Sequence, residues 1–446
     1  MSAHVPATSG RGSWASGPVL ARRAVLGGGL ALLGAGLAAC SHGSSSTVGG
    51  GPTASSTSAP VPSSATAAPG ATAASSSTAS AADRLPFAVD GLGTAGTVTT
   101  VSGSVPAADA RSLWTFGGDY SRIGSLPLDA TTVFGSESDH PDSLMSYSAA
   151  LLTKDSFTRL TPKVPATADP TTYREPQDGT ATAHRIVWRA ASVGTDENSS
   201  AIDDWEVWGY DRSAGGEAVR LASASALNGT DQTPAGPEVL PTSNDDAVYF
   251  ASNVKDSAAS EGWTRHVLQL GTSSGSDPVD LAAGDYPAAV DGGVLYAAPD
   301  HDGALTTLVE RTGASSVRTL VTLSGSWTIS GVWANGVHRA LAVGTSQGGD
   351  GSYLALWADG EEDDAVWLHV PSSRVIGSAS AARFAWGGGS DGEATDMFVV
   401  DWDGGGVARL GSATGYARPA LSPDGAVVLV PATDGNSPVT WTVVSL

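Results

Sequence analysis

From about residue 96 to the C-terminus, short runs of β-branched and aromatic residues alternate with clusters of Asp, Gly, Ser and Pro. This pattern predicts short β-strands joined by tight turns, and no stretch has the periodicity of a long amphipathic helix. Residues 205–223 and 396–412 are alike: each has an apolar strand, an Asp and Gly turn, and a second strand with Arg-Leu near its end. Because Gly tolerates the positive φ of tight turns, both are predicted hairpins.

A second element recurs beside these hairpins and is clearest in residues 421–430 (LSPDGAVVLV), where a Pro-Asp-Gly turn leads into a β-branched strand. Weaker copies start at Asn244, Val290 and Ala334. A repeat of about 40 to 45 residues with four short strands is typical of β-propeller blades. The segments that open the units follow one another in steps of 48, 42, 45 and 44 residues, starting near Pro237, Asp285, Trp327, Ser372 and Tyr416.

Two further units are expected before Pro237, around residues 130–139 and 184–190, which gives seven blades; six or eight stay open. The last hairpin, 437–446, ends one strand short of a blade. We expect residues 96–102 (GTVTTVS) to supply that strand and close the ring without an open sheet edge. The fold class is therefore all-β, a β-propeller over residues 83–446.

The turn at residues 422–425 (SPDG) and the hairpins that run from Asp into a Gly pair resemble the repeat of TolB-type β-propellers. The resemblance is clear in about three units and consists of structural turn residues. It implies the propeller fold more strongly than a function. TolB-type propellers bind protein partners at the mouth of the channel, and the resemblance implies the same here.

The N-terminal 39 residues are predicted to be a signal peptide. Arg22 and Arg23 precede an uncharged run that is too short for a comfortable membrane span and closes with small residues. Residues 37–40 (LAAC) resemble the lipobox of bacterial lipoproteins, which implies cleavage before Cys40 and lipidation of its thiol. The other interpretation of Cys40, the only cysteine, is a small buried hydrophobe.

The export route stays open. The arginine pair resembles a twin-arginine signal, although Ala21 stands where Ser or Thr is usual, and the general secretory route also starts with basic residues. Residues 40–82 then form the lipidated Cys40 and a linker of Ser, Thr, Ala, Pro and Gly, which cannot bury enough apolar surface to fold. Such a tether reaches roughly 35 Å. We therefore expect a lipid-anchored protein on the extracytoplasmic face of the cell membrane.

The charge of the propeller domain limits the kinds of partner that it can bind. All 45 Asp and Glu residues lie beyond residue 82. Three of the 23 Lys and Arg residues lie before that point, so the propeller domain is strongly acidic. Nucleic acid is therefore excluded as a partner. In the predicted blades, the loops between second and third strands share one face and carry many of the acids. These are Glu137, Asp139, Asp142, Asp196, Glu197, Asp203, Asp204, Asp256, Glu261, Asp300, Asp302, Asp350, Asp391, Glu393 and Asp434.

These acids have two interpretations: a solvated surface that keeps the protein soluble, or a docking face for a cationic partner. A candidate binding site lies nearer the channel, in the loops that enter each first strand. Tyr and Arg are typical of binding hot spots, although aromatic residues also pack between blades. The candidate channel-mouth residues are Tyr173, Arg174, Tyr286, Trp327, Arg374, Tyr416 and Arg418.

Metal and catalytic motifs are sparse. Residues 300–303 (DHDG) and 401–404 (DWDG) alternate oxygen ligands as calcium loops do, but both lack the third ligand and the distant Glu, so plain Asp-Gly turns are favoured. No metal or cofactor is expected, and a Ca²⁺ site among these acids is the open alternative. With Cys40 assigned to lipidation, no thiol nucleophile is left. The six domain histidines lack metal-ligand spacing, and there is no P-loop. Carboxylates from distant blades could still meet at the channel mouth.

The sequence thus predicts a membrane-anchored lipoprotein whose propeller is a binding or scaffolding module of the cell envelope. The alternative is a propeller enzyme of the glycosidase, lyase or lactonase type, acting on an envelope polysaccharide or small molecule. A purely structural spacer is the third reading. The expected partners are membrane lipid through Cys40 and an envelope protein or carbohydrate ligand, and the chain is expected to be a monomer.

Overall fold

The computed structural model describes most of the chain after Asp83. The signal segment, Cys40 and the linker to Ala82 lie outside the described residues. The described ranges are 84–94, 98–101, 110–119, 121–139, 147–163, 175–191, 204–230, 233–234, 240–273, 275, 277–313, 315–345, 351–372, 374–388, 394–414, 418–433 and 439–446.

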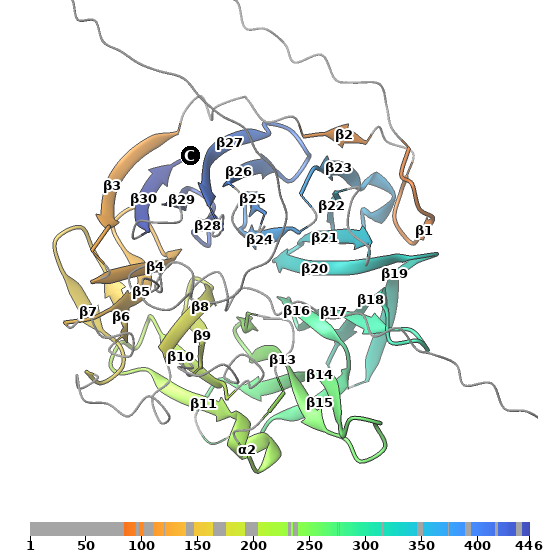
Figure 1. The fold of residues 1–446 in the computed structure, drawn as a ribbon, viewed down its shortest axis with the longest axis horizontal. Helices are drawn as coiled ribbons and strands as arrows, with labels where there is room; N and C mark the ends of the chain where they lie inside the picture. Colours follow the sequence, from red (N-terminus) through yellow and green to blue (C-terminus); the bar gives the residue numbers. More distant parts are fainter. Residues whose placement is uncertain are drawn as a thin grey trace, which may run out of the picture.

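In the described ranges, seven sheets built on antiparallel strands surround a central axis, so the chain is a seven-bladed β-propeller, as the repeat predicts (Figure 1). The first strand of each blade lies nearest the axis. Blade 1 holds β4 (Arg122–Pro127), β5 (Val133–Glu137), β6 (Ser148–Leu152) and β7 (Phe157–Arg159); blade 2 holds β8 (Glu175–Ala181), β9 (Arg185–Ala191), β10 (Glu206–Asp211) and β11 (Val219–Ser223); blade 3 holds β12 (Thr242–Ser243), β13 (Ala247–Lys255), β14 (Trp263–Gly271) and β15 (Val279–Ala283).

The remaining blades follow the same order around the ring. Blade 4 holds β16 (Asp285–Val290), β17 (Gly293–Pro299), β18 (Leu305–Thr312) and β19 (Ser316–Leu323); blade 5 holds β20 (Trp327–Asn335), β21 (His338–Thr345), β22 (Ser352–Ala358) and β23 (Val366–Val370); blade 6 holds β24 (Ile376–Ala379), β25 (Arg383–Gly387), β26 (Ala394–Asp401) and β27 (Ala408–Thr414); blade 7 holds β28 (Ala420–Leu421), β29 (Val427–Ala432), β30 (Thr440–Ser445) and β3 (Arg111–Gly117).

Side chains along the middle strands point alternately to the two faces of a blade, and this explains how the blades stack face to face. In β9, Ile186 and Trp188 pack against blade 1, where the Trp188 ring lies 5.0 Å from that of Phe134. Val187 points the other way and packs with Phe250 of blade 3. Successive side chains of a strand point to opposite faces, so a strand buried on both faces reads as a continuous apolar run. Each middle strand therefore belongs to two inter-blade cores.

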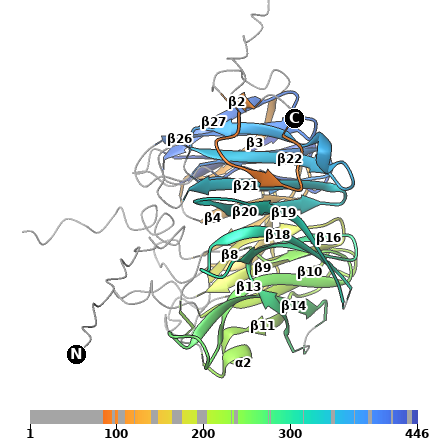
Figure 2. The same cartoon turned by 90° about the vertical axis from the view of Figure 1, so that its right-hand side faces the viewer.

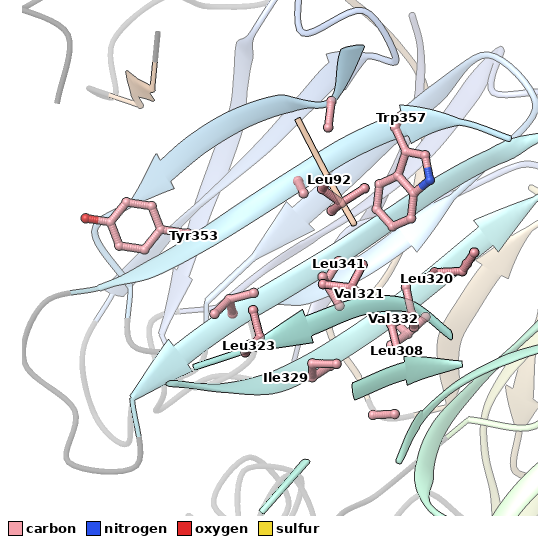
Figure 3. Packing of buried hydrophobic residues seen from close by; sticks show 14 of the residues in the cluster. Leu92, Leu308, Leu320, Val321, Leu323, Ile329, Val332, Leu341, Tyr353 and Trp357 are labelled. Atoms are coloured by element: carbon pink, nitrogen blue, oxygen red, sulfur yellow. The ribbon is translucent and has the colours of Figure 1, made fainter. Parts of the chain in front are cut away.

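The core between blades 4 and 5 shows this packing at close range (Figure 3). Leu308 and Val321 of blade 4 lie in one cluster with Ile329 and Leu341 of blade 5. All four are at most 2% exposed. Burying side chains of this size stabilises the fold by about 1.5–3 kcal/mol each, relative to exposure.

The ring closes differently from the sequence-based expectation. Residues 96–102 were predicted to complete the last blade, but β2 (Thr99–Thr100) lies within that range and pairs in parallel with β23 of blade 5. The closing strand is β3, which pairs antiparallel with β30. Its alternation places Trp114 and Phe116 in the core shared by blades 7 and 1, whereas residues 96–102 carry no side chain of that size.

The described residues 84–94 and 98–101 form a strap along the outer edges of blades 4 and 5. β1 (Val89–Asp90) pairs with β19, and β2 pairs with β23. Phe87 inserts between the two blades, 4.7 Å from the ring of Trp327 and 5.7 Å from that of Trp367. At Gly93 a Cβ would lie 1.9 Å from the carbonyl oxygen of Asp363, so only glycine allows this close approach.

Each blade is an antiparallel meander, so its first and third strands run in one direction and its second and fourth in the other. The loops between second and third strands and the crossings to the next blade therefore lie on one face, which we call the upper face. Figure 2 shows the ring from the side, with strands running between the two faces. Helices are short, as α2 (Ala224–Asn228) and η2 (Glu362–Asp364) illustrate. In the described ranges, no helix is long and apolar enough to cross a membrane.

Candidate functional site at the channel mouth

The acidic loops predicted to share one face do connect second and third strands, so their described acids lie on the upper face. In blade 1 these acids are paired: Glu137 with Arg159, and Asp139 with Arg159 and Lys163. Outside the described residues lie Asp142, Asp196, Glu197, Asp203, Asp350, Asp391, Glu393 and Asp434.

Other acids of this face build turns. Asp256 accepts hydrogen bonds from the Ala258 N–H at 2.8 Å and from the Thr264 hydroxyl at 2.8 Å. These bonds favour the ionised form and hold the pKa of Asp256 below its usual value. Local turn formation thus explains part of the acidity of the rim.

The two calcium-like loops also form turns. The Asp300 carboxylate accepts from the N–H groups of Asp302 at 2.9 Å and Ala304 at 3.0 Å. Asp300, His301 and Asp302 lie near enough to one another to share an ion. In the second loop, Asp403 accepts from the Gly405 N–H at 2.8 Å and Asp401 pairs with Arg383. Both loops therefore have the Asp-Gly turn geometry favoured from the sequence.

The predicted channel-mouth residues divide into three groups. Tyr173, Arg174 and Tyr416 lie outside the described residues. Trp327 is only 8% exposed and packs against Phe87, so the structure places it in the core between blades 4 and 5. Tyr286, Arg374 and Arg418 are half-buried on segments that enter the first strands of blades 4, 6 and 7.

Tyr286 has a strained backbone. Its φ is 52°, and it is the one non-glycine residue of positive φ in the described ranges. This conformation costs of order 1–3 kcal/mol for a bulky residue, and such outliers cluster at functional sites. The strand β16 is irregular here, since its pairing with β17 shifts between Asp285 and Ala288. The strain therefore marks the point where the chain turns from blade 3 into the first strand of blade 4.

The preceding residue, Asp285, is a buried carboxylate held from two sides. Its Oδ2 accepts from Arg265 Nε at 3.1 Å and its Oδ1 from Arg265 Nη2 at 3.3 Å. The backbone N–H of Tyr286 donates to Oδ1 at 2.9 Å. Burial raises the pKa of Asp285, and the charge of Arg265 opposes that rise. Blade 3 thus supplies the arginine that fixes the carboxylate of blade 4.

Two further arginines act on this pair from other blades. The charge of Arg189, in β9 of blade 2, acts on Asp285. The charge of Arg374, which precedes β24 of blade 6, acts on Tyr286. Arg189 and Arg374 thus belong to blades 2 and 6, which stand on opposite sides of blade 4 in the ring.

The phenol of Tyr286 is kept protonated. Burial, followed by the negative charge of Asp285, raises its pKa to about 12, although Arg265 and Arg374 act in the opposite direction. At neutral pH Tyr286 therefore offers a hydroxyl donor. Asp285 and the arginines therefore act on this phenol in opposite directions.

Sequence reasoning identified Tyr286 and Arg374 but missed Arg189, Arg265 and Asp285. One signal was available: Arg189 interrupts the apolar run of β9, and Arg265 lies in the middle strand of a blade, where a charge is costly unless it is paired. The sequence could not show that these charges act on one another, because the five residues come from blades 2, 3, 4 and 6.

Several solved structures are similar to this chain at low sequence identity. Oligogalacturonate lyase from Vibrio parahaemolyticus matches with a TM-score of 0.48 and 11% identity, over 82% of this chain and 98% of that one. TolB from Acinetobacter baumannii matches with a TM-score of 0.39 and 12% identity, over 71% of this chain and 64% of TolB.

The β-propeller domain of the Trilobed protease from Pyrococcus furiosus has a TM-score of 0.42 and 7% identity, over 73% of this chain and 95% of that one. No protein-family model matches the chain, and no curated protein matches its sequence. At these identities the likeness concerns the fold alone, so function has to be argued from the mouth of the channel.

Proposed function

We propose that this chain is an extracytoplasmic lipoprotein, anchored in the cell membrane through Cys40, whose propeller binds an envelope ligand at the upper mouth of its channel. One observation carries the proposal. Arg265 of blade 3 is bonded to the buried Asp285, next to the strained Tyr286, and the charges of Arg189 and Arg374 from two further blades act on these two residues. Convergent polar groups of this kind, placed by a rigid scaffold, are typical of ligand sites.

The residue types favour binding over catalysis. Arg and Tyr are enriched at binding hot spots. A glycosidase needs two carboxylates placed for acid and base roles, and Asp285 is instead bonded to Arg265. A protonated phenol and guanidinium groups supply hydrogen-bond donors of the kind that recognise a ligand.

Capture of an envelope partner should depend on Arg374. Full-length protein purified from membranes is cross-linked in envelope extract, and bound proteins are identified by mass spectrometry. We expect the Arg374→Gln variant to lose at least about 90% of the captured partner, since a hot-spot truncation costs 2 kcal/mol or more. The matched control is Arg383→Gln: Arg383 pairs with Asp401 at the start of a second strand, on the opposite face. Equal capture by wild type and Arg374→Gln would contradict a role for the mouth.

The anchor is tested separately by Cys40→Ala. We expect this variant to take up no fatty acid and to keep its N-terminal segment, because the cysteine is both the acylated residue and the first residue after the predicted cut. The measurements are metabolic labelling by a radioactive fatty acid and the mass of the purified protein. A variant that still takes up label, or a wild type that takes up none, would contradict lipidation at Cys40.

A further inference from the structure

Two blades carry a fifth strand that the ring does not need for its closure. In the described ranges, blades 1, 2, 3, 6 and 7 have four strands each, whereas β1 is added to blade 4 and β2 to blade 5 (Figure 1). Both added strands belong to the strap. The ring itself closes through the pairing of β3 with β30, to which the strap contributes nothing. The strap therefore lies on the outside of blades that are complete without it.

The backbone of the strap pairs with the two outer edges as a bound peptide strand does. β1 pairs antiparallel with β19, and beside this pair the Ala88 carbonyl accepts a hydrogen bond from the Ser324 N–H at 3.2 Å. β2 pairs in parallel with β23, and the Val101 N–H donates to the His369 carbonyl at 2.9 Å. Hydrogen bonds between backbones are how an open sheet edge binds an extended peptide, whereas pockets for alternate side chains supply the specificity.

The side chains of the strap alternate as this kind of binding requires. Leu85, Phe87 and Val89 pack against the core between blades 4 and 5, and the residues between them are exposed. Since successive side chains of an extended strand point to opposite sides, one set faces the groove and the other faces solvent.

Phe87 fills a pocket of three aromatic rings that all belong to blade 5. Its ring centroid lies 4.7 Å from that of Trp327 and 5.4 Å from that of Tyr353. Trp367 completes the pocket at 5.7 Å, with its ring edge-on to that of Phe87. Edge-to-face contacts of this length are favourable for aromatic pairs, so an aromatic side chain is the natural occupant.

Two glycines of the strap add a further sequence requirement. A Cβ at Gly91, where φ is 94°, would lie 1.8 Å from the Leu320 carbonyl oxygen. At Gly93 the N–H donates to the Glu362 carbonyl at 2.8 Å, and the close approach of the backbone leaves no room for a side chain. Among the phenylalanines of the chain, Phe87 alone is followed by glycine both four and six residues later.

We infer that the outer groove along β19, β23 and the three aromatic rings is a peptide-binding site, which the strap occupies as an intramolecular ligand. The partner that it fits is a protein segment of the same chemistry: an extended strand whose aromatic residue is followed by glycine four and six residues later. Such a segment binds by displacing the strap. The groove lies on the outer edge of the ring, so this site is separate from the channel mouth and does not depend on the proposed function.

Occupation by the strap protects the groove and sets a threshold for a partner. An empty groove would expose the three aromatic rings, and exposed apolar surface of this kind promotes association with other proteins. Residues 102–110 join the strap to β3, and a short covalent link of this kind gives an effective concentration of order mM. A free peptide at micromolar concentration therefore does not displace an intact strap.

The test uses a fluorescein-labelled peptide of residues 84–101 and full-length protein in which the strap is weakened by Phe87→Ala or, independently, by Gly91→Ala. Both changes lie in the strap and leave every residue of the groove as it is. Binding is followed by fluorescence anisotropy. We expect both variants to bind the peptide at least about tenfold more tightly than the wild type does, because the attached strap no longer competes fully.

Two altered peptides serve as controls on the pocket. A peptide with Phe87→Ala is expected to bind either variant at least about tenfold more weakly, which is the effect of losing one buried aromatic side chain. A peptide with Asp90→Asn should bind like the native peptide, since Asp90 is exposed in the strap. Equal binding of the native and Phe87→Ala peptides would overturn the inference.

The same variants show whether the strap is a ligand or a part of the fold. Urea denaturation followed by circular dichroism should give cooperative unfolding of both variants, because the seven blades and the closing strand are intact. Failure of both variants to fold would overturn the inference, since the propeller would then depend on its strap. Two folded variants that leave the native peptide unbound would overturn it as well.

Discussion

Substitution of Trp114 by alanine is expected to lower the free energy of unfolding by about 3–5 kcal/mol and to loosen the ring between blades 7 and 1. Trp114 is 8% exposed, its ring lies 5.1 Å from that of Phe116, and its Nε1 donates to the carbonyl of Ala130 in blade 1 at 2.8 Å. The variant therefore loses core packing and the hydrogen bond that joins the closing strand to the next blade. Urea denaturation followed by tryptophan fluorescence measures the loss.

The control for Trp114 is its neighbour Leu113 in the same strand, which is 37% exposed. Leu113→Ala is expected to change the free energy of unfolding by less than about 0.5 kcal/mol, as is usual for surface positions. Hydrogen exchange adds a local test, since β30 pairs with β3 and should lose protection only in Trp114→Ala. Equal stability of the two variants would contradict the assignment of β3 as the strand that locks the ring.

Replacing Arg339 by alanine is the second change expected to be severe, at about 3–5 kcal/mol. Arg339 is 2% exposed, and its Nη2 donates to Glu310 Oε1 at 2.6 Å while its Nη1 pairs with Asp359 at 2.8 Å. Removing the guanidinium leaves Glu310, a largely buried carboxylate, without its buried partner. The loss is measured by chemical denaturation at neutral pH.

Arg318 supplies a matched control because it contacts the same carboxylate, at 2.8 Å, but is 51% exposed. Arg318→Ala is expected to cost no more than about 1 kcal/mol, since exposed ion pairs are screened by water and salt. Raising the salt concentration should reduce the effect of Arg318→Ala and leave that of Arg339→Ala nearly unchanged. Similar losses of unfolding free energy in the two variants would show that burial does not determine how much each arginine of this cluster contributes to stability.

The blades could be predicted from sequence because each one is a local unit. The turn at 422–425 and the strand that follows it are neighbours along the chain, and in the structure they form the start of blade 7 with β28 and β29. The seven-fold count follows from repeats of this kind. Turn residues and the alternation of apolar and polar positions act over a few residues, so they can be recognised in a single sequence.

Ring closure and the mouth could not be predicted in the same way, because they depend on residues far apart in sequence. The pattern of residues 96–102 fits a strand, and nothing local says that it pairs with β23 rather than with β30. The ion pair of Arg265 with Asp285 forms only once blades 3 and 4 are side by side. Periodicity reports which face of a strand is buried and not which distant charge it will meet.

The pairing of β3 with β30 also determines when the ring can close during folding. β3 leaves the ribosome before the first three strands of every blade, and its partner β30 follows only after six blades have been made. Until then β3 has an unpaired edge and Trp114 lacks the core that buries it, so closure is a slow, long-range step that requires the whole chain. A chain that lacked β30 would expose both the edge of β3 and the Trp114 side chain, and it would behave as a partly unfolded protein.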